Sequence, residues 1–247
     1  MRPLALTLAL AALLSPLKAN ADASNGVLAT EIAYASDYRF DGLSSSDNEP
    51  VWQGYVYWWR PDNWFAGVFA SEAHYNGFGD STTSYEIDVW AGRHFDEGRR
   101  RITLDAMYSI FPDNETPGPT YDFLQLRAKA QHRGEQLTYG ASISFSPEAS
   151  YRAGDAWRLH TEASYTPRPW LTFTAGAGQR YVQRGQDRAF WDAGVTLRRE
   201  PFALDLRYYD TNLTQRECNF TDRCDAAIVG KISFRPPLLP LYDTTPD

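Results

Sequence analysis

The sequence lacks any long apolar run beyond its first residues, and it has few residues of the types that build metal or redox centres. After residue 21, no segment approaches the roughly 20 apolar residues that a membrane-spanning helix requires. The 247 residues include two cysteines and four histidines, with no Cys-x-x-Cys motif and no Cys/His cluster, so we predict neither structural zinc nor another cofactor. Positive charge is also scarce, since 24 Lys and Arg oppose 31 Asp and Glu, and this balance argues against a nucleic-acid partner.

The first residues have the pattern of a secretory signal peptide. Arg2 precedes an apolar run from Leu4 to Leu14, and Ala19-Asn20-Ala21 is a small-residue cleavage motif. We therefore expect residues 1–21 to be a cleaved signal peptide, with an uncleaved interfacial anchor as the alternative interpretation of the same run.

The two cysteines, Cys218 and Cys224, lie six residues apart in the polar segment CNFTDRC. A secreted chain reaches an oxidising compartment, where paired cysteines form and keep disulfides. The spacing therefore predicts one local disulfide.

Side chains in the rest of the chain alternate between apolar and polar with a period of two. In 101–111, Ile102 and Leu104 share one face, whereas Thr103 and Asp105 share the other. This alternation recurs between turn residues throughout the chain, and helical spacing is not sustained. It predicts twelve strands, at 26–38, 49–60, 63–75, 83–95, 99–111, 120–133, 135–146, 153–166, 168–181, 188–199, 201–211 and 225–235.

The predicted connections alternate in length. Those after even-numbered strands are tight, such as Pro61-Asp62-Asn63 and Asp96-Glu97-Gly98, and most of the others are longer and more polar, such as 212–224. Short periplasmic turns, longer outer loops and an even strand number are typical of outer-membrane barrels, whereas a soluble sandwich has no reason to follow this parity. We predict an all-β fold: a transmembrane antiparallel up-and-down β-barrel of about 12 strands over residues 22–234, with periplasmic termini and a periplasmic tail at 235–247.

Aromatic residues make up 15% of the sequence and cluster at the ends of the predicted strands. Trp58, Trp59 and Trp64, for example, flank one tight turn. Such rings are typical of the girdles at the two membrane interfaces. Ordinary cross-strand pairing within a hairpin is the alternative for any single pair.

Charged side chains recur on the polar face of the predicted strands. Lys or Arg on the lipid face would cost about 2–4 kcal/mol at the bilayer centre, so we expect these charges to face the lumen. The candidate pore-lining residues are Arg127, Lys129, Arg158, Arg207, Lys231, Glu86, Asp88 and Asp105. Acidic residues concentrate on the first, fourth and fifth strands and basic residues on the sixth, eighth and ninth. In a closed barrel the acidic strands and the basic strands would form two facing walls of the lumen. These walls would either create a transverse field that suits polar or zwitterionic solutes, or pair with each other and close the lumen.

Residues 36–54 read SDYRFDGLSSSDNEPVWQG. This segment resembles the opening signature of the TorF-like porin family of proteobacteria, in which S-D-Y-R-F-R-G-x-S precedes a Q-G pair. Asp41 stands where that family usually shows a basic residue. The resemblance returns at 66–71, 86–92 and 204–211, and it implies an outer-membrane barrel with a transport role.

The signature lies where the first predicted strand ends, so Asp37 and Arg39 are candidate residues of the pore entrance. Both side chains would either touch solute or bridge to loops and neighbouring strands. The sequence leaves these two alternatives open.

An outer-membrane lipid hydrolase is a competing class. His160 and Ser164 lie four apart on one strand face, about 13 Å at 3.3 Å per residue, which is too far for a base and its nucleophile. His160 and Glu162 could orient one another, but no nucleophile accompanies them. We therefore predict that the protein is not an enzyme.

The expected function is a porin-like channel of the bacterial outer membrane for passive diffusion of small polar or zwitterionic solutes. Its expected partners are outer-membrane lipids and the small solute, with no nucleic acid. A non-conducting barrel that acts as a scaffold or adhesin is the alternative, and the sequence does not indicate the solute or the oligomeric state.

Overall fold

A computed structural model describes residues 26–76, 82–112 and 121–241. The expected signal peptide lies outside these ranges. Within them, we find no helix of the length and apolar character needed to cross a membrane. The described chain is almost entirely strand, with one short 3-10 turn, η2 (Ser150–Arg152).

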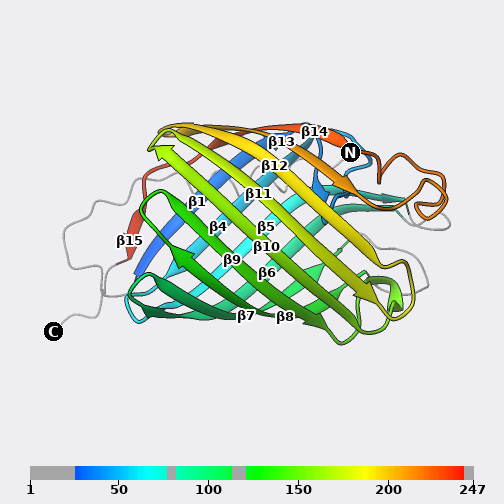
Figure 1. Cartoon of the computed structure of the whole chain (residues 1–247), viewed down its shortest axis with the longest axis horizontal. Coiled ribbons are helices and arrows are strands. Elements are labelled where there is room, and N and C mark those ends of the chain that lie inside the picture. Colours follow the sequence, from blue (N-terminus) through cyan, green and yellow to red (C-terminus); the bar gives the residue numbers. More distant parts are fainter. Residues whose placement is uncertain (1–25, 77–81, 113–120, 242–247) are drawn as a thin grey trace.

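Twelve long strands form one closed antiparallel barrel in the described part of the chain, which confirms the predicted fold class (Figure 1). They are β1 (Gly26–Ala35), β4 (Val51–Trp59), β5 (Trp64–Asn76), β6 (Thr82–Glu97), β7 (Arg100–Ile110), β8 (Phe123–Arg133), β9 (Leu137–Ser146), β10 (Ala156–Arg168), β11 (Leu171–Val182), β12 (Arg188–Arg199), β13 (Phe202–Thr211) and β14 (Ala227–Phe234). Each of the twelve matches one predicted strand to within a few residues at either end.

The barrel closes because β14 pairs with the second half of β1, with Ile32 opposite Phe234 and Ala35 opposite Lys231. The first half of β1 pairs instead with a short strand that was not predicted, β15 (Leu239–Leu241). Part of the C-terminal tail thus hydrogen-bonds to backbone groups of β1 that would otherwise form an open edge. The periplasmic location of the tail stays a prediction.

The two faces of each strand differ in polarity, as the period of two predicts. In β7, Leu104 is 49% exposed on the outside of the barrel, whereas the adjacent Asp105 is 9% exposed. Leu126, Leu204 and Leu206 on other strands are likewise about half exposed. The outer face is therefore apolar and the inner face polar, the reverse of a soluble protein.

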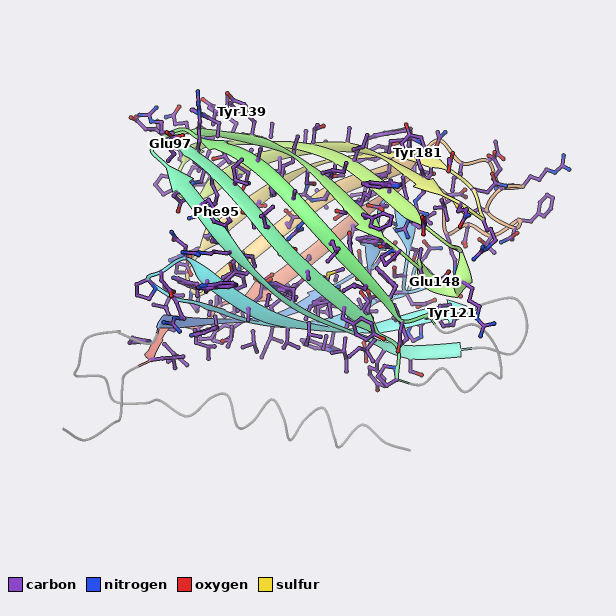
Figure 2. The ribbon with its side chains drawn as sticks, turned by 90° about the horizontal axis from the view of Figure 1, so that it is seen from below. Phe95, Glu97, Tyr121, Tyr139, Glu148 and Tyr181 are labelled. Atoms are coloured by element: carbon purple, nitrogen blue, oxygen red, sulfur yellow. A yellow bond between two sulfur atoms is a disulfide. The ribbon has the colours of Figure 1, made fainter. Side chains whose placement is uncertain are left out.

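The short turns gather at one end of the barrel and the longer loops at the other, so the alternation in connection length becomes a difference between the two ends (Figure 1). Aromatic side chains mark both ends: Phe95 and Tyr139 lie near the short turns, and Tyr181 lies near the long loops (Figure 2). These three rings are 46%, 50% and 47% exposed. Their positions fit the expected girdles.

Candidate pore lumen and mouth

One wall of the lumen combines acidic and aromatic side chains. Glu86 and Asp88 of β6 are 6% and 8% exposed. On the neighbouring strands, Tyr55 of β4 and Phe69 of β5 pack with their ring centroids 4.6 Å apart. The acidic arc predicted from the sequence thus lies in a part of the wall that aromatic rings fill.

Glycines let large rings lie flat against this wall. Gly67 of β5 faces Trp90 of β6 across the strand pair, and a Cβ added to Gly67 would lie 2.2 Å from the indole ring. Only a residue without a side chain permits this close approach. The wall is therefore closely packed at this level.

Several inward charges form ion pairs with adjacent or nearby strands instead of facing a distant wall. Arg127 donates to Asp105 at 3.0 Å, and Lys129 of β8 pairs with Glu162 of β10. On the other side of the barrel, Arg207 pairs with two carboxylates, at 2.5 Å from Asp192 and 3.3 Å from Asp205. These inward charges thus pair with carboxylates of the same or nearby strands, and whether the two walls create a transverse field or close the lumen stays a prediction.

Lys231 of β14 lies opposite Asp205 of β13 in the strand register. It is half-buried, as expected for a side chain on the inner face. Each predicted pore-lining residue therefore belongs to the inner face of the barrel, and its contact with solute stays a prediction.

Three arginines lie in one row at the long-loop end of the barrel. The register pairs Arg158 of β10 with Arg180 of β11, and Arg180 with Arg188 of β12. Like charges directly opposite each other on neighbouring strands are destabilising. This arginine cluster (Arg158, Arg180 and Arg188) therefore needs a nearby anion.

A hairpin in the segment between the first two predicted strands supplies that anion. Residues 36–50, here called the mouth hairpin, contain two short strands, β2 (Arg39–Phe40) and β3 (Leu43–Ser44). Asp41 and Gly42 form its tip with φ of 50° and 80°. Positive φ at both positions is the geometry of a type I′ turn, for which Asp-Gly is a preferred sequence. The dipeptide was the signal that could have predicted the hairpin.

The mouth hairpin crosses the opening of the barrel. Near its base, the backbone N–H of His74 in β5 donates to Ser45 O at 2.8 Å. At its tip, Asp41 contacts β10, β11 and β12, and β5 and β10 are well separated around the ring of strands. The hairpin tip also packs closely on β13, because a Cβ added to Gly42 would lie 2.3 Å from Thr211 Cγ2.

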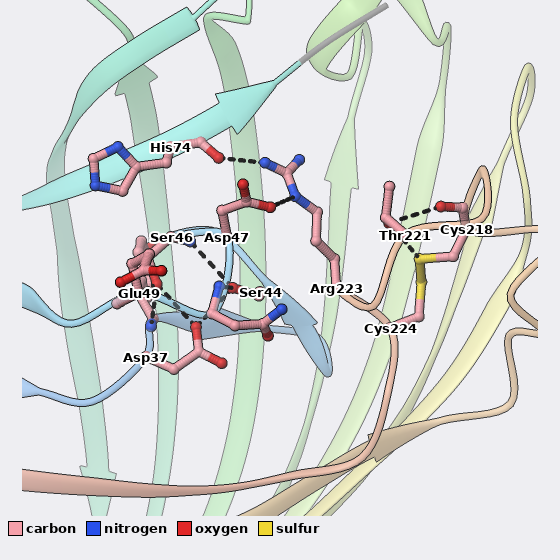
Figure 3. Close-up of polar contacts among 12 residues, drawn as sticks. Asp37, Ser44, Ser46, Asp47, Glu49, His74, Cys218, Thr221, Arg223 and Cys224 are labelled. Atoms are coloured by element: carbon pink, nitrogen blue, oxygen red, sulfur yellow. Dashed lines mark hydrogen bonds and ion pairs between the residues drawn. A yellow bond between two sulfur atoms is a disulfide. The ribbon is translucent and has the colours of Figure 1, made fainter.

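Asp37 and Arg39, the expected entrance residues, brace this hairpin. The Asp37 carboxylate accepts hydrogen bonds from Ser44 Oγ at 2.6 Å and Ser46 Oγ at 2.9 Å (Figure 3). It also accepts one from Arg39 Nε at 2.5 Å. Arg39 also donates to Asn48 Oδ1 and to the carbonyl of Asp225. Side-chain exposure is 2% for Arg39 and 6% for Asp37. These contacts give both residues structural partners, and their contact with solute stays a prediction.

Asp41 is the residue that joins the hairpin to the arginine cluster. Its side chain is fully buried, with Oδ1 2.7 Å from Arg158 Nε and Oδ2 3.7 Å from both Arg180 and Arg188. Arg188 Nε also donates to the backbone carbonyl of Asp41 at 3.2 Å. One carboxylate is thus within ion-pair distance of three guanidinium groups.

The long loop between β13 and β14 holds the mouth hairpin from the other side. Its Arg223 donates to Asp47 Oδ1 at 2.8 Å and to His74 O, and the Arg223 carbonyl accepts from Ser44 N at 2.9 Å (Figure 3). The predicted disulfide between Cys218 and Cys224 is confirmed and closes a turn that ends next to Arg223. The disulfide therefore restrains a loop that contacts the mouth.

In the same loop, Glu217 accepts hydrogen bonds from the backbone N–H and the hydroxyl of Thr214, each at 2.8 Å. These bonds stabilise the carboxylate and lower the pKa of Glu217 from its usual value. The turn therefore keeps its charge and its internal hydrogen bonds over the physiological pH range.

We expect reduction of the Cys218–Cys224 bond to change barrel stability little. A ring of this size constrains the unfolded chain by about 2 kcal/mol at most, while the closed ladder of strands dominates the fold. Urea unfolding with and without reductant measures the difference. On intact cells a maleimide should label the protein only after reduction, and labelling without reduction would contradict the disulfide.

The side chains considered for hydrolysis have other partners. His160 stacks on Phe190 with ring centroids 5.8 Å apart, and Ser164 shares a hydrogen bond with Thr174 at 3.2 Å. Glu162 pairs with Lys129. Across the described ranges, no group of three or more His, Cys, Asp or Glu side chains could hold a metal ion. The contacts of His160, Ser164 and Glu162 are thus structural ones.

Comparisons with known proteins agree with the barrel. A model of the Gcw_chp family, described as a bacterial protein of unknown function, matches residues 18–234. The search of curated proteins gave no match. Among solved structures, the KdgM porin aligns with a TM-score of 0.55 and 6% identity over 84% of this chain and 98% of that one. The NanC porin aligns with a TM-score of 0.55 and 10% identity over 84% and 97%.

A third similar structure is an outer membrane channel from Pseudomonas putida F1, with a TM-score of 0.54 and 9% identity over 85% of this chain and 96% of that one. At such low identities, the similarity to all three concerns the fold.

Proposed function

This chain belongs to the Gcw_chp family of bacterial proteins of unknown function, and we propose that it is a porin-like channel of the bacterial outer membrane. Small polar or zwitterionic solutes would diffuse passively through its lumen. The observation that carries the proposal is a closed twelve-stranded barrel with an apolar outer face and a charged inner face.

The outer face supports a membrane location. Monomeric soluble proteins rarely expose contiguous apolar patches of more than a few hundred Å². Here large apolar side chains are about half exposed on strand after strand, including Leu104, Phe173 and Leu204. A closed barrel also leaves no strand edge unpaired, as the bilayer interior requires. The polarity of the two faces favours lipid outside and water inside.

The inner face supports passage of polar solutes. Twelve strands give a barrel between the eight-stranded size that side chains fill and the open pores of 16 to 18 strands. The lumen has acidic and basic arcs, and such charged walls set solute preference in pores. The similar folds of the KdgM and NanC porins, and the resemblance to TorF-like porins, support the same function.

One observation favours the alternative of a non-conducting scaffold or adhesin. The mouth hairpin crosses the opening at the long-loop end and is held there by Arg39, Asp41 and Arg223. If the remaining gap excludes ions, the long loops would act as a binding surface. Electrical recording separates the two functions directly.

We expect the purified protein to stay folded in detergent, to migrate differently on gels before and after heating, and to conduct in steps in planar lipid bilayers. The closed ladder of strands explains the resistance to detergent, and the polar lumen explains the current. The matched control is the same preparation after heat unfolding, which should produce no steps. A folded, inserted protein that conducts nothing at any voltage would contradict the channel and favour the scaffold.

A further inference from the structure

We propose that the arginine cluster at the mouth is a binding site for the carboxylate of a solute, and that Asp41 is a tethered occupant which the solute displaces. The inference deepens the proposed channel function by naming the solute class, and its solute-selecting role rests on that function. It is carried by the row of three arginines and by the geometry of Asp41 within it.

The row of three arginines requires an anion close by. Arg158, Arg180 and Arg188 occupy directly paired positions on three adjacent strands. Three like charges in register repel each other. An inner face selected for stability alone would carry neutral side chains at some of these positions. The row therefore indicates a function for concentrated positive charge at the mouth.

Asp41 satisfies the charge and the hydrogen-bonding capacity of the arginine cluster only in part. The three arginines and Asp41 together carry two positive charges in excess. Asp41 Oδ1 makes one short contact, 2.7 Å from Arg158 Nε, while Oδ2 is buried and accepts no hydrogen bond from any residue that the structure describes. Guanidinium groups bind carboxylates best through two parallel hydrogen bonds. A carboxylate free to orient would use the cluster better than the one at the hairpin tip.

Aromatic rings lie next to the arginine cluster, as is common in ligand sites. The Arg158 guanidinium lies 5.1 Å from the Phe190 ring centroid and 5.7 Å from that of Phe40 in the mouth hairpin. Rings at such distances restrict the orientation of the guanidinium group and reduce its contact with water. Displacing Asp41 would move Phe40 with it, because the two residues are adjacent in the hairpin, so binding and widening of the mouth are coupled.

The test compares binding of D-glucuronate with that of D-glucose to detergent-solubilised protein by isothermal titration calorimetry. Asp41→Asn removes the competing charge but keeps the shape, and asparagine tolerates the positive φ of this position. We expect this variant to bind glucuronate about tenfold more tightly than the unmodified protein, equivalent to about 1.4 kcal/mol. Glucose binding should be the same in both.

Asp187→Asn is the matched control for loss of one negative charge near the mouth. Asp187 is exposed, precedes Arg188, and accepts a hydrogen bond from Val182 N at 2.8 Å, which an asparagine can also accept. Its affinity for glucuronate should stay within about twofold of the unmodified protein, because a solvent-exposed charge is screened. Adding Arg158→Gln and Arg188→Gln to Asp41→Asn should abolish the gain.

Equal glucuronate affinity in the unmodified protein and the Asp41→Asn variant would overturn the inference. An equal gain in the Asp187→Asn variant would overturn it too, since the effect would then be one of net charge. The binding measurement needs no current. If the protein binds glucuronate as expected but never conducts, the binding site is supported and the channel function is contradicted. If the protein conducts but Asp41→Asn does not raise its affinity for glucuronate, the channel function is supported and the binding site is contradicted.

Discussion

Replacing Gly42 by alanine should raise the single-channel conductance at least about twofold, since the mouth hairpin crosses the opening of a barrel that is wider than the eight-stranded size that side chains fill. Gly42 has φ of +80°, where a Cβ is strained, and its Cβ would lie 2.3 Å from Thr211 Cγ2 and 2.7 Å from Asp210 O. The backbone carbonyl of Asp210 belongs to the barrel wall and cannot move aside. The hairpin tip would therefore have to leave β13 and take Asp41 out of the arginine cluster.

Gly98→Ala is the control for this variant. Gly98 also has positive φ, +58°, but a Cβ there meets nothing within 4 Å, and the residue lies in a short turn at the other end of the barrel. It imposes similar backbone strain without a steric clash and should leave conductance unchanged. Planar bilayer recordings of both variants, after the gel-shift check for folding, measure the difference. If Gly42→Ala conducts like the unmodified barrel, the hairpin does not limit the current.

The strands of the barrel could be predicted because lipid and lumen impose opposite polarity on alternate residues. Thr103, Leu104 and Asp105 illustrate this, since each lies on the face that its polarity predicted. The predicted ends of the strands were less accurate than the strands themselves. The first was expected to reach residue 38, but β1 ends at Ala35, because the chain then enters the mouth hairpin, where Tyr38 N donates to Ser46 Oγ at 2.9 Å.

The mouth hairpin was missed for a different reason. Its polar residues, such as Ser44, Ser45 and Ser46, suggest an exposed loop, yet these three are 3%, 3% and 0% exposed. They are buried because Asp37 and the neighbouring loop satisfy them, and such long-range hydrogen bonds leave no local period in the sequence. A polar segment inside a polar lumen shows no alternation of polar and apolar residues from which its position could be predicted.

The candidate site was predicted in part. Alternation placed Arg158 on the inner face, but Arg188 was overlooked because it is the first residue of its strand, even though it shares a face with Phe190 and Asp192. The sequence could not predict that Asp41 contacts Arg158 and Arg188, since 117 residues separate Asp41 from Arg158. The period of two predicts on which face of the strand a side chain lies, whereas its ion-pair partners depend on how a loop folds over the barrel.

Replacing all three residues of the arginine cluster by glutamine should shift ion preference from anions towards cations. The mouth is the part of the lumen that the hairpin narrows, so its charge dominates selectivity. The cluster and Asp41 together carry two excess positive charges, and in the triple variant only the negative Asp41 would be left. At short range in a partly dehydrated site, such a change is worth several kcal/mol, so the chloride-to-potassium permeability ratio should fall at least about threefold.

Reversal potentials in a potassium chloride gradient measure this ratio. The control replaces Arg99, Arg168 and Arg199 by glutamine, which changes net charge by the same amount at exposed positions near the short turns. Water and salt screen those charges, so the control should shift the ratio much less. Equal shifts in the two triple variants would mean that net charge, and not the mouth, sets the preference. No shift in either would place the selective part of the lumen elsewhere, with the paired charges around Arg207 as the next region to test.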